Sequence, residues 1–370
     1  MQLIVRRSSA LAAFALVSLA ALTAHAEEGW LSMRTGYYKE RSTRVIQPML
    51  DGHIEISDDD AFDFHGLVDS ITSASAATGA PVNAGVAIPQ FDEKRYEGGL
   101  GYTHGFDGRY KLGGAFSSST ESDYDSNFIG VRGEASFDDK NTVLALGLGR
   151  NFDSISNGAG GVATDHKKMN GGSSSLSLTQ LINPRLFATF VYEFMDVHGY
   201  QANIYRRVSG SDTPTPERVP DLRLRHALYA ELRGFKPLSV TTYVLGYRFY
   251  VDDWGIAAHT LEARLIQELV PGLEVRARYR FYVQNAADFY EDTYSKEQVD
   301  NDPYITDDAK LDAYHTHVFG GQLVASLSLF GVEGTWSTMR VDVIVERVLQ
   351  TNAFGNAWSG QLGLVVPVAW

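Results

Sequence analysis

The 370-residue sequence contains no cysteine. A disulfide framework and covalent haem attachment through a Cys-x-x-Cys-His motif are therefore excluded. The stability of the fold must come from backbone pairing and from burial of side chains.

The sequence also lacks an apolar run long enough for a membrane helix. The uncharged run from Leu11 to Leu22 has about twelve residues, whereas a transmembrane helix needs roughly twenty. This run follows Arg6 and Arg7 and precedes Ala24-His25-Ala26, an order that is typical of a secretory signal peptide. We predict cleavage before Glu27, so that residues 1–26 are a signal peptide and residues 27–370 form a single domain.

An excess of positive charge is missing as well. The net charge of −13 becomes −15 when the predicted signal peptide and its two arginines are removed. This acidic balance argues against nucleic-acid binding. The composition, with 35 glycines and 12% aromatic residues, suits a chain of many strands and turns. A chain of this length often forms two domains, but large barrels are an exception.

Alternation of apolar and polar residues with a period of two is abundant. From Leu273 to Gln284, the odd positions are apolar and the even positions are polar or amphipathic, and residues 239–251 repeat the pattern. Such alternation predicts strands that have one apolar face. We count sixteen of them, beginning near residues 29, 45, 61, 91, 110, 126, 142, 172, 186, 222, 239, 256, 273, 313, 332 and 356.

Tight turns alternate with longer loops along these strands. With both termini on the periplasmic side, every tight turn also falls on that side, as in outer-membrane barrels. The longer loops are 73–90, 152–171, 198–221 and 285–312. The tight turns lie at Asp58-Asp59-Asp60, Asp107-Gly108-Arg109, Asp138-Asp139-Lys140-Asn141, Asn183-Pro184-Arg185, Lys236-Pro237, Pro271-Gly272 and Gly331.

The last segment, Gln361 to Trp370, has apolar residues on one face and an aromatic residue at its end. It resembles the closing strand that the outer-membrane assembly machinery reads, and Pro367 predicts a local irregularity near the rim. We therefore predict an all-β, transmembrane, antiparallel up-and-down β-barrel of about 16 strands in a bacterial outer membrane. A secreted all-β domain is the alternative.

If the apolar faces meet lipid, many charged residues fall on positions that face the lumen. A turn centred on Pro271 would place Glu262 opposite Arg280 and Arg264 opposite Arg278. One interpretation is an anion-attracting channel lining; the other is a salt-bridge ladder that stiffens a water-filled lumen. The inward charged residues are Arg223, Arg225, Glu231, Arg233, Arg248, Glu262, Arg264, Glu274, Arg276, Arg278, Arg280, Arg340 and Glu346.

The loop 285–312 carries nine acidic residues against two lysines, a local charge of −7. One hypothesis places it in the mouth of the barrel, beside Arg264, Arg276, Arg278 and Arg280. The other is a solvated outer loop whose oxygen ligands bind divalent cations.

His315 and His317 share one side of a predicted strand, a spacing that suits a metal. The same positions also suit a polar rim at the outer end of an apolar face. We expect the polar rim, and we predict neither a metal nor a cofactor.

Four segments of the first 130 residues are similar to a family of proteobacterial outer-membrane barrels that is known only as a domain of unknown function. The resemblance implies an outer-membrane location and no established activity. The segments are Tyr37-Tyr38-Lys39-Glu40, Val45-Ile46-Gln47-Pro48, Val68-Asp69-Ser70-Ile71-Thr72-Ser73-Ala74-Ser75 and Glu121-Ser122-Asp123-Tyr124-Asp125-Ser126.

The function predicted from the sequence is a porin-like passive channel with a basic lumen wall. The alternative is a plugged structural or interaction barrel whose acidic outer loops bind a periplasmic or extracellular partner. A barrel hydrolase is third, although no Gly-x-Ser-x-Gly motif occurs. The expected partners are outer-membrane lipid and the assembly machinery, through the C-terminal strand; a homo-oligomer is left open.

Overall fold

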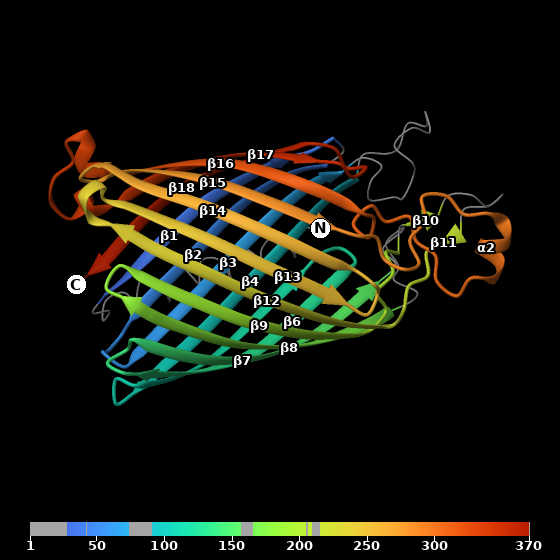
Figure 1. Cartoon of the computed structure of the whole chain (residues 1–370), viewed down its shortest axis with the longest axis horizontal. Helices are drawn as coiled ribbons and strands as arrows, with labels where there is room; N and C mark the ends of the chain where they lie inside the picture. Colours follow the sequence, from blue (N-terminus) through green and yellow to red (C-terminus); the bar gives the residue numbers. More distant parts are fainter. Residues whose placement is uncertain are drawn as a thin grey trace, which may run out of the picture.

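The computed structural model describes residues 28–41, 43–73, 91–156, 166–204, 206–208 and 215–369. In these residues, sixteen antiparallel strands form one closed barrel (Figure 1). Neighbours in the barrel follow chain order, and the last strand pairs with the first. The predicted fold class and strand number are confirmed.

The barrel strands are β1 (Glu28–Lys39), β2 (Thr43–Glu55), β3 (Asp60–Ser73), β4 (Phe91–Phe106), β5 (Tyr110–Thr120), β6 (Tyr124–Phe137), β7 (Thr142–Ser156), β8 (His166–Asn183), β9 (Leu186–Gly199), β12 (Leu222–Lys236), β13 (Thr241–Asp252), β14 (Ala257–Val270), β15 (Leu273–Gln284), β16 (Tyr314–Ser326), β17 (Arg340–Gln350) and β18 (Ala357–Ala369). The predicted signal peptide and Trp370 lie outside the described residues.

Neighbouring residues of one strand face opposite sides of the barrel wall, because the side-chain period of a strand is two. In β13, Leu245 is 55% exposed, whereas Val244 is 2% exposed. Val244 is paired with Arg233 on one side and Arg264 on the other, so it lies on the charged face. Leu245 belongs to the opposite, outward face, which is rich in exposed apolar residues. Within the described ranges, no helix is long and apolar enough to cross a membrane.

The two ends of the barrel carry different connections. The start of β1 pairs with the end of β18, Glu28 opposite Ala369, at the end where the predicted tight turns lie. We call this the terminus end and the opposite one the long-loop end. At the terminus end, Asp107, Asp138, Asp139 and Lys140 adopt left-handed backbone angles, which tight hairpin turns require.

The connection between β16 and β17 differs from the prediction. A tight turn at Gly331 and a strand from about residue 332 were expected. Instead, two 3-10 helices, η3 (Leu327–Phe330) and η4 (Gly334–Thr338), occupy this segment, and β17 begins at Arg340. Gly331 and Gly334 both have left-handed φ angles, which glycine adopts readily, and pairing resumes only at Arg340.

Pro367 lies near the terminus rim, as expected, but it does not interrupt the pairing of β18 with β1. Its partner in β1 is Trp30, and the register continues on both sides. The pairing with β17 stops earlier, where Val365 faces Arg340. The missing amide hydrogen of Pro367 therefore falls in a part of β18 that is paired with one neighbour only.

Two long connections pack together beyond the strands and form a structure that we call the knob, made of the described parts of residues 200–221 and 285–312 (Figure 1). It contains β10 (Arg207–Val208), β11 (Thr215–Pro216) and α2 (Lys296–Asn301). A small apolar core of Val208, Tyr294, Val299 and Ile305 holds it together. Arg218 and Ile305 exchange backbone hydrogen bonds that join the two loops.

Ile305 is fully buried in this core, which predicts that Ile305→Ala loosens the knob alone. A buried isoleucine truncated to alanine costs about 2–5 kcal/mol. We expect faster hydrogen–deuterium exchange of residues 289–308, with unchanged exchange in β12 to β15. Leu238→Ala, at a residue that is 96% exposed, is the control. Equal effects of the two variants would contradict the role of Ile305.

Candidate functional site

Three predicted lumen arginines converge on one carboxylate. Glu262 accepts a hydrogen bond from Arg278 at 2.9 Å and forms ion pairs with Arg264 at 3.0 Å and with Arg280 at 3.5 Å. The predicted pairing is confirmed: Glu262 is opposite Arg280, and Arg264 is opposite Arg278. The carboxylate lies between like charges that would otherwise repel each other across the two strands.

The ion pairs continue to both sides of Glu262. On β12, Glu231 accepts from Arg233 at 3.0 Å and from Arg264 at 2.9 Å. On β17, Glu346 accepts from Arg278 at 2.8 Å. The network of Glu231, Arg233, Glu262, Arg264, Arg278, Arg280 and Glu346, which we call the charged wall, thus extends from β12 to β17.

Some ion pairs of the charged wall join side chains that are two strands apart, and the strand between them carries a glycine at that position. Gly320 of β16 lies directly between Arg278 and Glu346 in the register. A Cβ added there would lie 2.9 Å from Oε1 of Glu346. Gly246 of β13 lies opposite Glu231, and a Cβ added there would lie 3.0 Å from the hydroxyl of Tyr229. Side chains two strands apart can therefore meet above a strand that presents only backbone.

The remaining predicted residues near the terminus end are held in separate contacts. Arg276 pairs with Glu274 and donates to Gln322 at 3.3 Å. Gln322 in turn donates to Asp342 at 3.0 Å. Arg340 is the first residue of β17 and is exposed, and it has no ion pair within the described residues.

Arg223 and Arg248 lie nearer the long-loop end, and each has its own carboxylate. Arg223 donates to Asp252 through Nε at 2.9 Å, and its guanidinium lies 4.2 Å from the centre of the Trp254 ring. Arg248 pairs with Glu193 at 2.9 Å. These two arginines are therefore neutralised locally.

Arg225 is different, because the described part of the chain provides no ion-pair partner for it. Its Nη1 lies 3.8 Å from the sulfur of Met195, and its Nε is buried without a hydrogen bond. It borders two lumen cavities, one in the barrel and one towards the knob. Arg225 is thus a guanidinium that faces open space with donors to offer.

Histidines and aspartates of β2 and β3 form a second polar group in the lumen, which the sequence analysis missed. Asp51 lies 2.6 Å from Nδ1 of His65, and Asp63 lies 2.7 Å from Nδ1 of His53. His65 also lies 4.0 Å from Glu97. The sequence does contain a signal for this group, an Asp-x-His triplet on each side of the turn at 58–60. Antiparallel pairing across that turn places each aspartate opposite a histidine.

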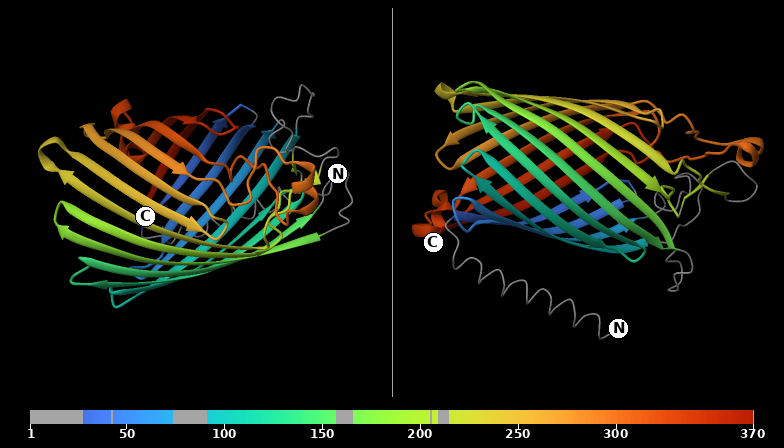
Figure 2. Two further views of the ribbon diagram at one scale, coloured as in Figure 1. Left: turned by 45° about the vertical axis from the view of Figure 1, so that its right-hand side comes forward. Right: turned by 90° about the horizontal axis from the view of Figure 1, so that it is seen from below.

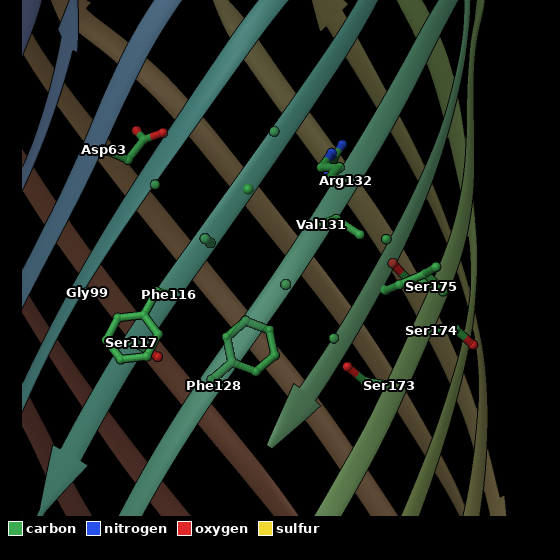
Figure 3. Close-up of a pocket in the computed structure, with 18 of the residues that line it drawn as sticks. Asp63, Gly99, Phe116, Ser117, Phe128, Val131, Arg132, Ser173, Ser174 and Ser175 are labelled. Carbon is green, nitrogen blue, oxygen red and sulfur yellow. The ribbon is translucent and has the colours of Figure 1, made fainter. Parts of the chain in front are cut away.

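A lumen cavity of about 980 Å³ lies between these two groups. Asp51 and His65 border it from one side, and Arg225 and Arg248 from the other. Figure 3 shows Ser117, Ser173, Ser175 and Phe128 along the strands in between. Glycines of β4 to β7 also border it: Gly99, Gly101, Gly113, Gly130, Gly147 and Gly149. Side chains of this size leave the middle of the lumen open.

The acidic loop 285–312 does not lie where one hypothesis placed it. Figures 1 and 2 show its helix α2 beyond the ends of the strands. Its acidic residues Asp307 and Asp308 contact Arg206 of the other loop, at 3.5 and 3.1 Å. The expected position beside Arg264, Arg276, Arg278 and Arg280 is therefore wrong, because those arginines bind barrel carboxylates. Only the base of the loop reaches the lumen, at the cavity that Arg223 and Arg225 border.

The cation-binding hypothesis for this loop gains no support. Within the described ranges, one group of three metal-ligating side chains lies close together, Glu93, Glu121 and Asp123, and none of them belongs to the loop. Burial raises the pKa of Glu121 to about 7, and the charge of Glu93 adds to the effect. Three acidic residues of the knob, Glu217, Asp307 and Asp308, surround Arg206 instead, and burial raises the pKa of Glu217.

A closed antiparallel barrel with an apolar outer face and a polar lumen defines the class of outer-membrane β-barrel proteins. Within that class, the chain belongs to the DUF3570 family, described as "Protein of unknown function", whose model matches residues 7–343. No curated protein matches the sequence.

Solved structures resemble the chain in fold at very low sequence identity. CdiB from Acinetobacter baumannii is 8% identical, with a TM-score of 0.53 over 92% of this chain and 60% of that one. A BenF-like porin from Pseudomonas fluorescens Pf-5 is 9% identical, with a TM-score of 0.48 over 93% and 98%. Pseudomonas aeruginosa OccK2 (OpdF) in complex with glucuronate is 9% identical, with a TM-score of 0.45 over 92% and 96%.

The position of Gly320 predicts that alanine substitutions at residues 320 and 321 have very different effects on the stability of the barrel. Gly320→Ala should push Glu346 away from Arg278 and destabilise the barrel by about 1–3 kcal/mol, as overpacking does. Gly321→Ala is the matched control, because a Cβ there meets nothing within 4 Å. Urea unfolding of the barrel refolded into vesicles measures both. Equal stabilities would show that the Arg278–Glu346 pair does not depend on the glycine.

Proposed function

We propose that this protein is a passive channel of the bacterial outer membrane that favours small anionic solutes. The observation that carries the proposal is Arg225, an unpaired guanidinium beside an open lumen cavity of about 980 Å³. An anion that reaches it gains charge-assisted hydrogen bonds without breaking an existing ion pair. The arginines of the charged wall already bind carboxylates and contribute less.

The proposal includes the membrane orientation. Short connections at one end and long ones at the other are the pattern of barrels whose termini face the periplasm. The knob would then lie outside the cell, and Arg225 would stand near the outer mouth. The final strand, β18, would serve as the segment that the assembly machinery recognises.

Replacement of Arg225 by glutamine tests the proposed site. One charge a few ångströms from the solute path is worth on the order of 1 kcal/mol in a wet pore. We therefore expect Arg225→Gln to lower the anion-to-cation permeability ratio by roughly fivefold. Reversal potentials under a salt gradient across planar bilayers measure the ratio.

Arg150→Gln is the matched control for this experiment. Arg150 alternates with the exposed residues Leu148 and Phe152, so it lies on the outward face of β7. The same change of charge there should leave the ratio unchanged. A wild-type barrel with no anion preference, or a ratio that Arg225→Gln does not alter, would refute the proposed role.

The knob favours a second candidate function, a barrel that binds a partner through its long loops. It has its own core and stands clear of the strands, as an interaction module would. In that case the lumen need not conduct. A silent wild-type barrel at all voltages would support this candidate over the channel.

Excision of the knob's tip separates the two candidates further. Tyr290 and Thr306 are bridged, so a short glycine–serine linker can replace residues 291–304. We expect unchanged single-channel conductance in planar bilayers, because these residues project past the strands. A large rise in conductance would show that the knob blocks the pore and that the projecting position does not describe the closed barrel.

A further inference from the structure

Among the residues that the structure describes, the outward face carries one arrangement of side chains three times. Each copy has a tyrosine and a phenylalanine two residues apart on one strand, and a histidine on the next strand. We call it the aromatic–histidine module. The copies are Tyr192, Phe194 and His226 on β9 and β12; Tyr247, Phe249 and His259 on β13 and β14; and Tyr279, Phe281 and His317 on β15 and β16.

The geometry of the three copies is nearly the same. The tyrosine hydroxyl lies 2.8, 2.8 and 2.9 Å from Nδ1 of its histidine. The two rings are stacked, with planes 26°, 27° and 27° apart. The phenylalanine is directly opposite the histidine in the register of each strand pair. A threefold repeat of one geometry on three strand pairs is more than ordinary aromatic packing requires.

Each histidine is held in a way that leaves one ring nitrogen available. A tyrosine hydroxyl that donates to Nδ1 leaves the proton of the neutral ring on Nε2. In the described residues, Nε2 of His226, His259 and His317 makes no hydrogen bond and no ion pair. In the tautomer in which the tyrosine hydroxyl donates to Nδ1, Nε2 is an N–H donor on the outward face; in the opposite tautomer it is an acceptor.

The histidines of all three modules lie near the long-loop end of the barrel. His226, His259 and His317 each follow within a few residues of the long-loop end of their strand. Tyrosines at such a level are typical of a membrane–water interface, where the ring meets lipid tails and the polar atom meets headgroups. Under the proposed orientation, on which this step rests, the interface is that of the outer leaflet.

The charges around this level favour an anionic ligand. Arg347, which lies over the ring of Trp358, and Arg150 occupy outward positions near the same end. The outward carboxylate of Asp196 is already 3.6 Å from Arg150 and 3.3 Å from His198. The histidine Nε2 atoms and the positive charge of Arg347 thus remain to interact with lipid headgroups.

We propose that the three aromatic–histidine modules bind the phosphate groups of anionic lipid in the outer leaflet. The histidine Nε2 donates to a phosphate oxygen, while the tyrosine and phenylalanine contact the acyl chains below it. Phosphate suits this site because it combines negative charge with several strong acceptors. The modules thereby fix the height and rotation of one side of the barrel in the membrane.

The test compares lipid retention by the full-length barrel in detergent, counted by native mass spectrometry. The probes are lipid A with both phosphates and the same lipid after enzymatic dephosphorylation. The variant H226F/H259F/H317F removes the three donors and keeps the rings. We expect the wild type to prefer the phosphorylated lipid, and the variant to bind it about tenfold more weakly, since hydrogen bonds to charged groups are strong.

Two further variants keep the test decisive. Y192F/Y247F/Y279F removes only the hydroxyls that orient the histidines and should weaken binding partly, even if the first variant folds poorly. L100F/I129F/L148F adds rings on outward positions elsewhere and should have no effect.

Three results would overturn the proposal. They are an equal affinity of the wild type for both lipids, a preference that the histidine variant retains, and an oligomer that the histidine variant loses. The last result would assign the modules to contacts between copies of the chain. Because lipid binding needs no conduction, failure here is distinguishable from failure of the channel proposal.

Discussion

The pairing of β1 with β18 is the contact on which the rest of the molecule depends. An open sheet of sixteen strands would leave two unpaired edges, and a hydrocarbon environment offers nothing to satisfy them. Closure removes the edges and, with them, the freedom of each strand to slip. Because the side-chain period is two, a fixed register assigns every residue to the outer face or the lumen. The charged wall lies on the lumen side of the barrel, and the aromatic–histidine modules lie on its outer side.

Much of this arrangement could be predicted from the sequence, because alternation specifies faces and short turns specify register. The turn at Pro271-Gly272 is tight enough that Glu262 and Arg280 could be paired in advance, and the structure agrees. The connection from β16 to β17 could not be predicted in this way. Gly331 was compatible with a single tight turn, and nothing local shows that Gly334 also takes a left-handed φ and delays pairing until Arg340.

The site was harder to predict than the fold, because partners come from several strands. Arg223 and Arg225 share a strand and a face, so alternation treats them alike. Asp252 binds Arg223, while Arg225, although it lies opposite Asp252 in the register, makes no ion pair within the described residues. The histidine–aspartate pairs of β2 and β3 were missed for a related reason. Their residue types looked ordinary until the register placed each aspartate opposite a histidine.

The ion-pair partners of the lumen arginines bear on their two interpretations, an anion-attracting lining and a salt-bridge ladder. An arginine that shares Glu262 with two others cannot leave it for a solute without exposing uncompensated charge, so the charged wall is best understood as a scaffold. Its rigidity has a structural basis, since Gly320 allows Arg278 and Glu346 to join strands that are not neighbours. The scaffold leaves the lumen open on the side of small residues. In the proposed channel, the attraction of anions is assigned to Arg225, because this arginine makes no ion pair within the described residues.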